Sequence, residues 1–185
     1  MIENYHTVMD KYAVVSDIHG DSGMLKMLIN RAIKESAKAI LCLGDIGLSQ
    51  SADIVDSIRS SSLPFSIVRG NCDSAWDFSN VSMHMPPKYK TVELGDRTIF
   101  FTHGDSIKVW HDAPVHLLQN DIFAFGHTHV PILYRDDKSP WILNPGSASR
   151  PRCNCDPSMA FVTNEEIRIV SILTGMVLKK GLQWL

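Results

Sequence analysis

Two histidines with one residue between them, His127 and His129, follow an apolar run in the segment DIFAFGHTHVP at residues 121–131. In an extended chain, side chains two residues apart point to the same side, so the two imidazoles lie close together and face one way. Imidazole is a common metal ligand in proteins. The pair is compatible with three interpretations: a structural turn, a site for one metal ion, or a site for two.

The same arrangement, an apolar run that ends in Asp, Asn or His beside a glycine, recurs along the chain. It follows the runs AVVS, ILCL, SIVR, TIFFT, IFAF and WIL. Ligand sites form at the carboxyl ends of strands in open α/β sheets, and glycine lets a loop turn tightly there. If these ends meet at one edge, seven side chains converge: Asp17, His19, Asp45, Asn71, His103, His127 and His129.

Seven ligands are too many for one tetrahedral ion and suit two ions that share a carboxylate. Imidazole and carboxylate groups suit Mn, Fe, Zn, Co or Ni, and the set contains no cysteine, which argues against a thiolate zinc site. Each short motif alone is weak evidence, because D-x-H and G-D occur often by chance. Their occurrence together, in order and at strand ends, predicts a metal centre.

The elements that position these residues alternate between strand and helix in the first half. The segments KYAVVSD, AKAILCLGD and PFSIVRGN read as strands, and the alternation predicts parallel βαβ units. Between the first two strands, Asp21 or Ser22 is a natural N-cap. The helical stripe that follows contains Leu25, Leu28, Ile29, Ala32 and Ile33. A second helix, over residues 51–60, has its apolar stripe at Ile54, Val55 and Ile58.

The second half is predicted to be mostly β. The segment KTVELGDRTIFFTHGD predicts a hairpin with its turn at Gly95-Asp96, and a single short helix is expected over residues 114–120. Further short strands are expected near Phe123, Trp141, Phe161, Ile169 and Val177. No linker separates the halves, so we expect one α/β domain over residues 1–185.

Composition excludes several classes of protein. The 185 residues are 44% hydrophobic and 21% charged, with a net charge of -2, which argues against a general nucleic-acid binder. No apolar run reaches the roughly 18 residues that span a bilayer, and residues 1–10 contain no signal-peptide pattern. The four cysteines predict a reduced, cytoplasmic protein, with Cys153 and Cys155 as free thiols. A homo-oligomer is compatible with these properties.

The sequence resembles the calcineurin-like metallophosphoesterases, whose ordered motifs are D-x-H, G-D, G-N-[HC]-[DE], H-G and G-H-x-H. Here they read DIH (17–19), GD (44–45), GNCD (70–73), HGD (103–105) and GHTH (126–129). With GNCD and NPGS, the chain is most similar to the small bacterial phosphodiesterases of the YfcE type. The resemblance implies a β-sandwich flanked by helices, in α/β/β/α layers.

The resemblance also implies roles for the ligands. One ion would be held by Asp17, His19, Asp45 and His129. The other would be held by Asp45, Asn71, His103 and His127. A hydroxide bridging the two ions would attack phosphorus in a small phosphoester substrate, with Mn²⁺ the expected metal. The catalytic set would be Asp45, Asn71, Cys72 and His103.

Cys72 departs from the wider family, in which a histidine at this position is thought to protonate the leaving group. A thiol can donate a proton but is an uncertain substitute. We therefore hypothesise that the enzyme favours esters with good leaving groups or uses water as the acid. A packing role for Cys72 as a small apolar residue is the alternative.

Other polar residues have weaker functional signals. Asp105 and Asn144 are candidates to orient the histidines, and loop capping is an equally good interpretation. Arg150 and Arg152 could reach a phosphate, Ser147 could line the pocket, and a role in a turn is the alternative. No ligand role is predicted for His6, His84, His111 and His116.

Two other functions remain open on sequence grounds. A phosphomonoesterase or protein phosphatase would use the same site. A non-catalytic scaffold, as in the small retromer subunit, would share the fold with an incomplete metal shell. The complete set of ligand positions in this chain favours an enzyme.

Overall fold

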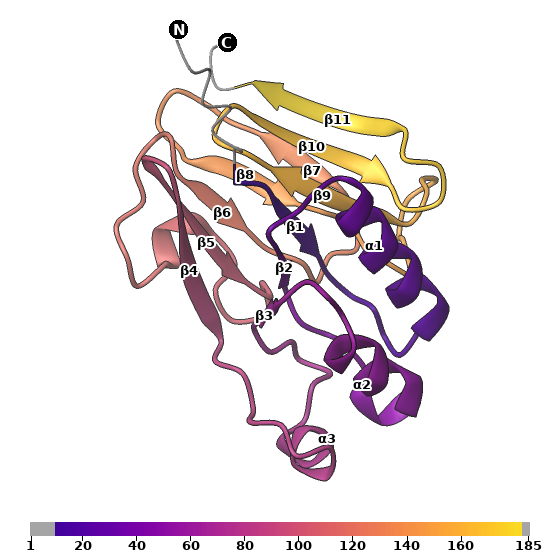
Figure 1. Cartoon of the computed structure of the whole chain (residues 1–185). Helices are drawn as coiled ribbons and strands as arrows, with labels where there is room; N and C mark the ends of the chain where they lie inside the picture. Colours follow the sequence, from indigo (N-terminus) through magenta and orange to yellow (C-terminus); the bar gives the residue numbers. More distant parts are fainter. Residues whose placement is uncertain (1–9, 183–185) are drawn as a thin grey trace, which may run out of the picture.

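The structure, a computed structural model, describes residues 10–182. The predictions for His6 and for a signal sequence lie outside the described residues. The chain forms two mixed sheets that pack face to face, with helices on the outer face of one of them (Figure 1).

The first sheet has six strands in the order β11-β10-β9-β1-β2-β3. Its strands are β1 (Tyr12–Val15), β2 (Ala39–Cys42), β3 (Phe65–Ile67), β9 (Ser158–Val162), β10 (Glu166–Ser171) and β11 (Val177–Leu182). Strands β1, β2 and β3 are parallel, as the βαβ pattern predicted, whereas β9, β10 and β11 pair antiparallel.

The second sheet has five strands in the order β4-β5-β6-β8-β7. They are β4 (Tyr89–Leu94), β5 (Arg97–Thr102), β6 (Ile122–Ala124), β7 (Ile132–Tyr134) and β8 (Trp141–Asn144). Strands β5, β6 and β8 are parallel, and β4 and β7 pair antiparallel at the two edges. Each sheet therefore has a group of parallel strands that end at a common edge.

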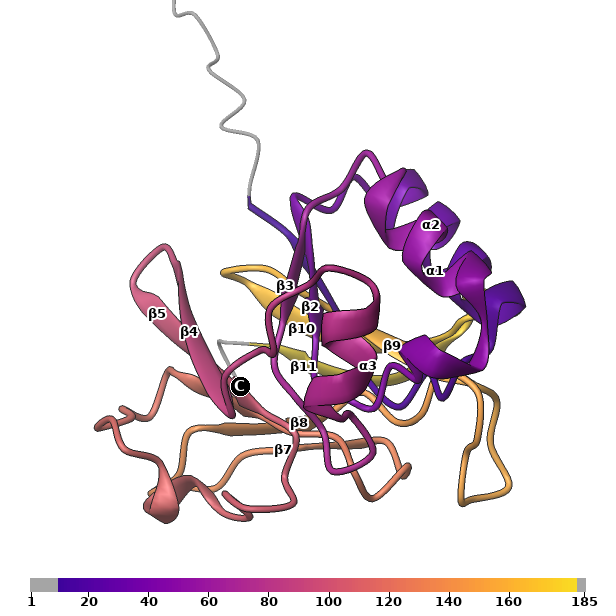
Figure 2. The ribbon, with the colours of Figure 1, turned by 90° about the horizontal axis from the view of Figure 1, so that it is seen from below.

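Helices α1 (Ser22–Lys34), α2 (Ala52–Arg59) and α3 (Ala75–Asn80) lie on the side of the first sheet that faces away from the second (Figure 2). The 3-10 helices are η1 (Leu48–Gln50) and η2 (Trp110–Asp112). The outer face of the second sheet is covered by the segment that contains η2 rather than by an α-helix. Its buried residues Phe100, Phe123 and Ile142 pack with Leu117 of that segment.

Alternation along the central strands explains their continuous apolar runs. In β1, Ala13 and Val15 pack toward the helices, whereas Tyr12 and Val14 pack between the sheets. Successive strand side chains point to opposite faces, and β1 is covered on both, so each of its four residues is buried. The interface between the sheets forms one apolar core that fixes the positions of both sets of strand ends.

The predicted fold class is confirmed, and several local predictions need correction. Asp21 caps α1 as predicted, since its side chain accepts a hydrogen bond from the Met24 amide at 2.9 Å. Ile33, predicted to be buried, is 45% exposed, because the stripe turns away from the sheet at the last turn of α1. Residues 114–120 form no helix; the short helical turn lies earlier, at η2. Helix α3 and strand β7 were not predicted.

The prediction of free thiols at Cys153 and Cys155 was wrong. A disulfide joins the two residues, which lie in the loop between β8 and β9. Cys42, in β2, is a buried free thiol, and burial raises its pKa to about 12. Within residues 10–182, every helix is too short or too polar to span a bilayer.

Candidate metal centre

The carboxyl ends of the parallel strands from both sheets meet at one edge of the molecule. Backbone hydrogen bonds join the loops within each sheet: the His19 amide donates to the Asp45 carbonyl at 2.9 Å, and the Gly126 amide donates to the His103 carbonyl at 2.8 Å. The His127 amide donates to Oδ2 of Asp17 at 3.1 Å and so links the two sheets. The seven predicted ligands are carried by these loops.

Five of these ligand residues adopt a left-handed backbone conformation that L-residues seldom occupy. Their φ angles are Asp17 56°, His19 46°, Asp45 54°, His127 62° and His129 61°. Non-glycine residues persist in this region only where the surrounding structure imposes it, and they cluster at functional sites. The unusual backbone aims these side chains into a shared space instead of along the strands.

Glycine at two positions lets the loops approach each other. A Cβ atom at Gly70 would overlap Oδ1 of Asp45, and a Cβ atom at Gly126 would overlap Oγ of Ser16. Any side chain at either position would push an aspartate or a loop out of the site. The glycines of the G-N and G-H motifs are therefore required by close contact.

Three of the predicted ligands form a tight first group. Oδ1 of Asp17 lies 3.2 Å from Nε2 of His129 and 3.8 Å from Nε2 of His19, and the two imidazole nitrogens are 3.3 Å apart. Ligand atoms that sit about 2.1 Å from one ion are roughly 3–4 Å from each other. The spacing of this group fits a single cation.

A second group lies beside the first and shares Asp45 with it. Nε2 of His103 lies 3.1 Å from Oδ1 of Asn71 and 3.5 Å from Oδ2 of Asp45. The same Oδ2 of Asp45 is 3.9 Å from Nε2 of His19 in the first group. The His127 ring lies next to that of His103, with centroids 5.1 Å apart. All seven predicted ligands are thus brought together.

The polar atoms of the two groups are arranged as the ligands of a cation would be. Oδ1 of Asp17 is buried and accepts no hydrogen bond within the described residues. Nδ1 of His103 faces the Leu43 carbonyl at 2.8 Å, and Nδ1 of His129 faces the Arg150 carbonyl at 2.7 Å. A ring whose Nδ1 donates to a carbonyl presents the lone pair of Nε2 when neutral. Both lone pairs then point at carboxylate or amide oxygens, an arrangement that bound metal ions would satisfy.

The electrostatics of the site are those of a cation-binding site. Burial alone would raise the pKa of Asp45, but the hydrogen bond and charge of His103 and the Cys72 amide outweigh it and lower that pKa. Burial similarly opposes the charged form of His103, yet Asp45 and Asp17 raise its pKa. The pKa of His19 is lowered, chiefly by burial. Asp45 is therefore ionised at neutral pH and available as a ligand.

Asp73 is a positioning residue that the sequence analysis missed. Its carboxylate accepts hydrogen bonds from the amides of Asp45 at 2.8 Å, Ile46 at 3.0 Å and Gly70 at 2.8 Å. Asp73 therefore ties the loop after β2 to the loop after β3, and so Asp45 to Asn71. Its place as the last residue of GNCD was the available signal.

Of the two interpretations given for Asn144, the structure supports loop capping. The Asn144 amide donates to the Gly126 carbonyl at 2.8 Å and to Thr128 Oγ1 at 2.9 Å, so it holds the backbone of the G-H-x-H loop rather than an imidazole ring. The hydroxyl of Ser147 is buried and donates to the Asp17 carbonyl at 2.9 Å. Asp105 makes no hydrogen bond to a histidine among the described residues.

Cys72 and the two arginines lie at the rim of the site. The Cys72 side chain is exposed, and its amide donates to Oδ1 of Asp45 at 2.8 Å. Partial burial and Asp45 raise the pKa of the thiol to about 11. Arg150 is exposed, and its positive charge contributes to the lowered pKa of His19. Arg152 is also exposed.

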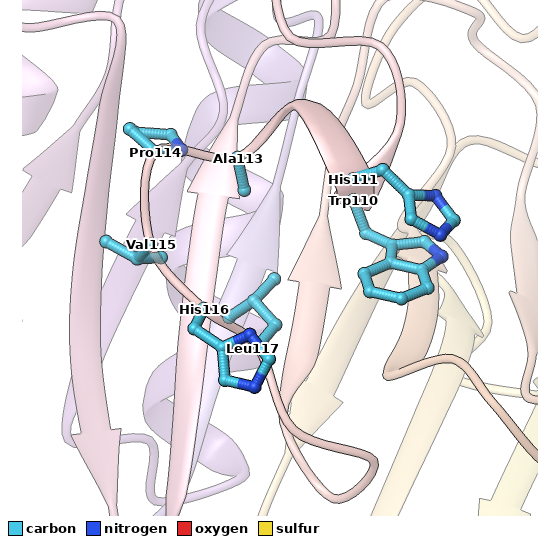
Figure 3. Close-up of a pocket in the computed structure, with 7 residues that line it drawn as sticks. All are labelled: Trp110, His111, Ala113, Pro114, Val115, His116 and Leu117. Atoms are coloured by element: carbon cyan, nitrogen blue, oxygen red, sulfur yellow. The ribbon is translucent and has the colours of Figure 1, made fainter.

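Two further histidines, His111 and His116, lie apart from the centre. His111 and His116 line a surface hollow of about 510 Å³ formed by residues 110–117 (Figure 3), which contains none of the predicted ligands. There the His111 ring stacks on Trp110 with centroids 3.6 Å apart. His84 is exposed. These positions agree with the absence of a predicted ligand role.

Comparison with known proteins places the site in context. The chain is 26% identical over 174 residues to phosphodiesterase YfcE of Escherichia coli strain K12, covering 89% of this chain and 93% of that protein. It is 28% identical over 162 residues to the probable metallophosphoesterase YsnB of Bacillus subtilis strain 168, covering 82% and 83%.

Solved structures of other proteins share the fold of this chain. The solved structure of the E. coli phosphoesterase YfcE superposes with a TM-score of 0.82 at 24% identity, over 93% of this chain and 98% of that one. Vps29 of Entamoeba histolytica shares the fold with a TM-score of 0.64 at 20% identity, over 92% and 97%. The sequence model of the calcineurin-like phosphoesterase superfamily domain matches residues 11–166. Because this match spans most of the sequence, the chain belongs to the calcineurin-like phosphoesterase superfamily.

Proposed function

We propose that the protein is a phosphodiesterase that depends on two divalent metal ions, and that residues 1–185 act as one catalytic domain. The observation that carries the proposal is the position of Oδ2 of Asp45, 3.9 Å from His19 and 3.5 Å from His103. One carboxylate oxygen thus faces both ligand groups, as a bridging ligand must. Asp17, His19, Asp45 and His129 would hold one ion. Asp45, Asn71, His103 and His127 would hold the other, with Mn²⁺ the expected metal.

The residues present define the chemistry of the site. Bound divalent ions supply positive charge for phosphate oxygens and make water nucleophilic at neutral pH. Asp17 and Asp45 are the only anions in the ligand set, and Asn71 is neutral, so two divalent ions leave a net positive charge. Such a site favours an anionic phosphate and its more negative transition state. The exposed face of Asn71 marks the side from which the ester would enter.

Protonation of the leaving group is the step for which the site has the least suitable residue. Cys72 stands where a wider-family member has histidine, and its pKa of about 11 keeps the thiol protonated at neutral pH. A protonated thiol has its proton available but gives it up reluctantly. We therefore propose a preference for esters whose leaving group needs little protonation.

The diester assignment follows the name of the E. coli relative, and a phosphomonoesterase would use the same groups. Parallel assays of bis(p-nitrophenyl) phosphate and p-nitrophenyl phosphate, with Mn²⁺, Zn²⁺, Co²⁺ and Ni²⁺ in turn, separate the two. We expect Mn²⁺-dependent hydrolysis with higher kcat/KM for the diester. A higher value for the monoester would overturn the diester assignment.

A scaffold function is the second candidate, because Vps29 shares the fold. The complete and closely spaced ligand set favours the enzyme. Metal content measured by mass spectrometry after Mn²⁺ loading and desalting discriminates the two. Two ions per chain support the enzyme, and a chain that retains no metal and hydrolyses neither ester is a scaffold.

A further inference from the structure

A polar pocket of about 310 Å³ adjoins the metal centre and is lined by Arg69, Gly70, Asn71, Asp73, Lys88 and Asp105. We propose that this pocket binds a second anionic group, a phosphate, carried by one substituent of the diester substrate. The inference rests on the proposed function and specifies the class of substrate: phosphodiesters with an additional phosphate.

Asn71 connects the pocket to the reacting centre. Its side chain lies against Nε2 of His103 at 3.1 Å and also lines the pocket. Asp105, two residues beyond His103, also lines the pocket. A substrate whose scissile phosphate lies at the ligand cluster would therefore place one of its substituents in this pocket.

The backbones of the two cationic residues are fixed beside the site. The Arg69 amide donates to the Pro87 carbonyl at 3.0 Å, and the Lys88 carbonyl accepts from Oγ1 of Thr102 at 2.9 Å. Thr102 is the residue immediately before His103. Arg69 therefore follows the same strand as Asn71, and Lys88 lies beside the end of the strand that precedes His103. The fold thus fixes the distance of both backbones from the centre.

Their side chains have no partner in residues 10–182: neither the Arg69 guanidinium nor the Lys88 ammonium makes a hydrogen bond or ion pair there. Two lysines elsewhere on the surface differ in this respect, since Lys26 pairs with Asp53 at 3.1 Å and Lys38 with Asp10 at 2.7 Å. The pocket therefore contains two cationic side chains whose donors are available to an anionic ligand.

The free donors of the pocket suit an anion. The formal charges of its lining balance, with Arg69 and Lys88 against Asp73 and Asp105, but the Asp73 carboxylate already accepts hydrogen bonds from three backbone amides, whose dipoles offset part of its charge. Arginine binds phosphate oxygens in a bidentate manner and lysine as a point charge. The combination suits a phosphate group better than a neutral sugar or base.

A matched pair of esters tests this proposal. The p-nitrophenyl esters of thymidine 5′-phosphate, with and without a 3′-phosphate, share the scissile bond and the leaving group. We expect the 3′-phosphorylated ester to have the higher kcat/KM, and Arg69→Ala or Lys88→Ala to reduce the ratio of the two values by about tenfold or more, because each variant removes charged hydrogen-bond donors to the added phosphate. Lys26→Ala, which removes the same charge from α1, should leave the ratio at its wild-type value.

Calorimetric titration with thymidine 3′,5′-bisphosphate and thymidine 5′-phosphate provides a readout that does not need turnover. Tighter binding of the bisphosphate, lost in Arg69→Ala and Lys88→Ala but not in Lys26→Ala, supports the pocket. The proposal is overturned if the two nucleotides bind with equal affinity, or if the variants lose the same amount of affinity for both nucleotides. If neither ester is hydrolysed, the proposed function fails while the titration still decides the pocket.

Discussion

Buried aspartates occur both beside the amino end of β6 and at the edge where the parallel strands of the two sheets end, and their surroundings differ. Asp121, at the start of β6, accepts from the Thr98 amide at 2.7 Å with one oxygen and from the Leu118 amide at 2.6 Å with the other. Asp17, at the opposite edge, accepts from the His127 amide with Oδ2, while Oδ1 accepts no hydrogen bond within the described residues. Asp45 also has one oxygen on an amide and the other facing imidazoles.

The difference separates carboxylates that are fully hydrogen-bonded from carboxylates that have an oxygen available for a metal ion. A carboxylate with both oxygens on backbone amides fixes the chain and has no capacity left for a metal. A buried carboxylate with one anchored and one free oxygen is held rigidly but is costly to bury without a cation. Asp73 and Asp121 belong to the first kind, and Asp17 and Asp45 to the second.

The largest expected effect on activity comes from replacing the carboxylate of Asp45 by the neutral amide of asparagine. Asp45→Asn should lower kcat/KM by about 10³-fold or more, because it removes a charge from the centre of the site, and should abolish retention of the second metal ion.

Asp121→Asn is the matched control, and it should reduce stability rather than activity. Its new NH₂ group would face a backbone amide, so the free energy of unfolding should fall by about 1–3 kcal/mol, whereas kcat/KM of the folded fraction should stay near wild type. Thermal unfolding and steady-state kinetics on both variants check the contrast. If Asp45→Asn left turnover and bound metal intact, the assignment of a bridging ligand would be wrong.

Asp73→Asn should have an intermediate effect. One oxygen of Asp73 accepts from the amides of both Asp45 and Gly70, and the substitution replaces one of the two carboxylate oxygens with a donor. All seven ligands remain, so both ions should still bind, but with affinity reduced about 10–100-fold, as for other residues that orient ligands. Titration of the metal-free protein with Mn²⁺ measures this. Unchanged affinity would show that the loops hold their geometry without Asp73.

Cys72→His should have a smaller and selective effect. An imidazole at this exposed position would donate a proton more readily than a thiol whose pKa is about 11. We expect kcat for a diester with an alkyl leaving group to rise by about tenfold or more, in the range of general acid catalysis, with little change for bis(p-nitrophenyl) phosphate. An equal response of both esters would eliminate protonation as the reason.

Short-range patterns predicted most of the strands and the grouping of the seven candidate ligands, whereas the arrangement in two packed sheets was implied by the family resemblance. Apolar runs flanked by Gly and Asp marked the strands, because β1 and β2 are buried on both faces. The ligands could be predicted because each follows such a run directly, and parallel strands in both sheets end at the same edge. The left-handed backbone at Asp17 and Asp45 could not be read from the sequence, since glycine is the usual residue there.

Other features depend on contacts between distant segments. The role of Asp73 depends on amides that are 28 and 27 residues away at Asp45 and Ile46. Helix α3 has only six residues and one buried side chain, Phe78, too little for a periodic pattern. The disulfide between Cys153 and Cys155 was missed because the prediction relied on an assumed reducing compartment rather than on the loop itself.

The smallest effect is expected at a surface ion pair remote from the site. Glu35 lies 2.9 Å from Nη2 of Arg168 and 3.4 Å from Nζ of Lys11. Partial burial raises the pKa of Glu35, but these hydrogen bonds and charges outweigh burial and lower it below its ordinary value of 4.5. A carboxyl whose pKa is lower in the folded state stabilises the protein fully above its unfolded-state pKa, and this contribution is lost as the pH falls through the folded-state value.

Glu35→Gln should therefore reduce the free energy of unfolding by about 0.5 kcal/mol at neutral pH, the usual size for a partly exposed pair. The difference from wild type should shrink as the pH drops below 4.5, since the wild-type carboxyl then becomes protonated and loses its charge. Urea unfolding at neutral and acidic pH measures both values. Glu165→Gln, at an exposed carboxylate with no ion pair within residues 10–182, is the control and should show no such convergence. A Glu35→Gln difference that grows on acidification would mean that the pair opposes folding, and the contrast between satisfied and unsatisfied carboxylates would then not extend to the surface.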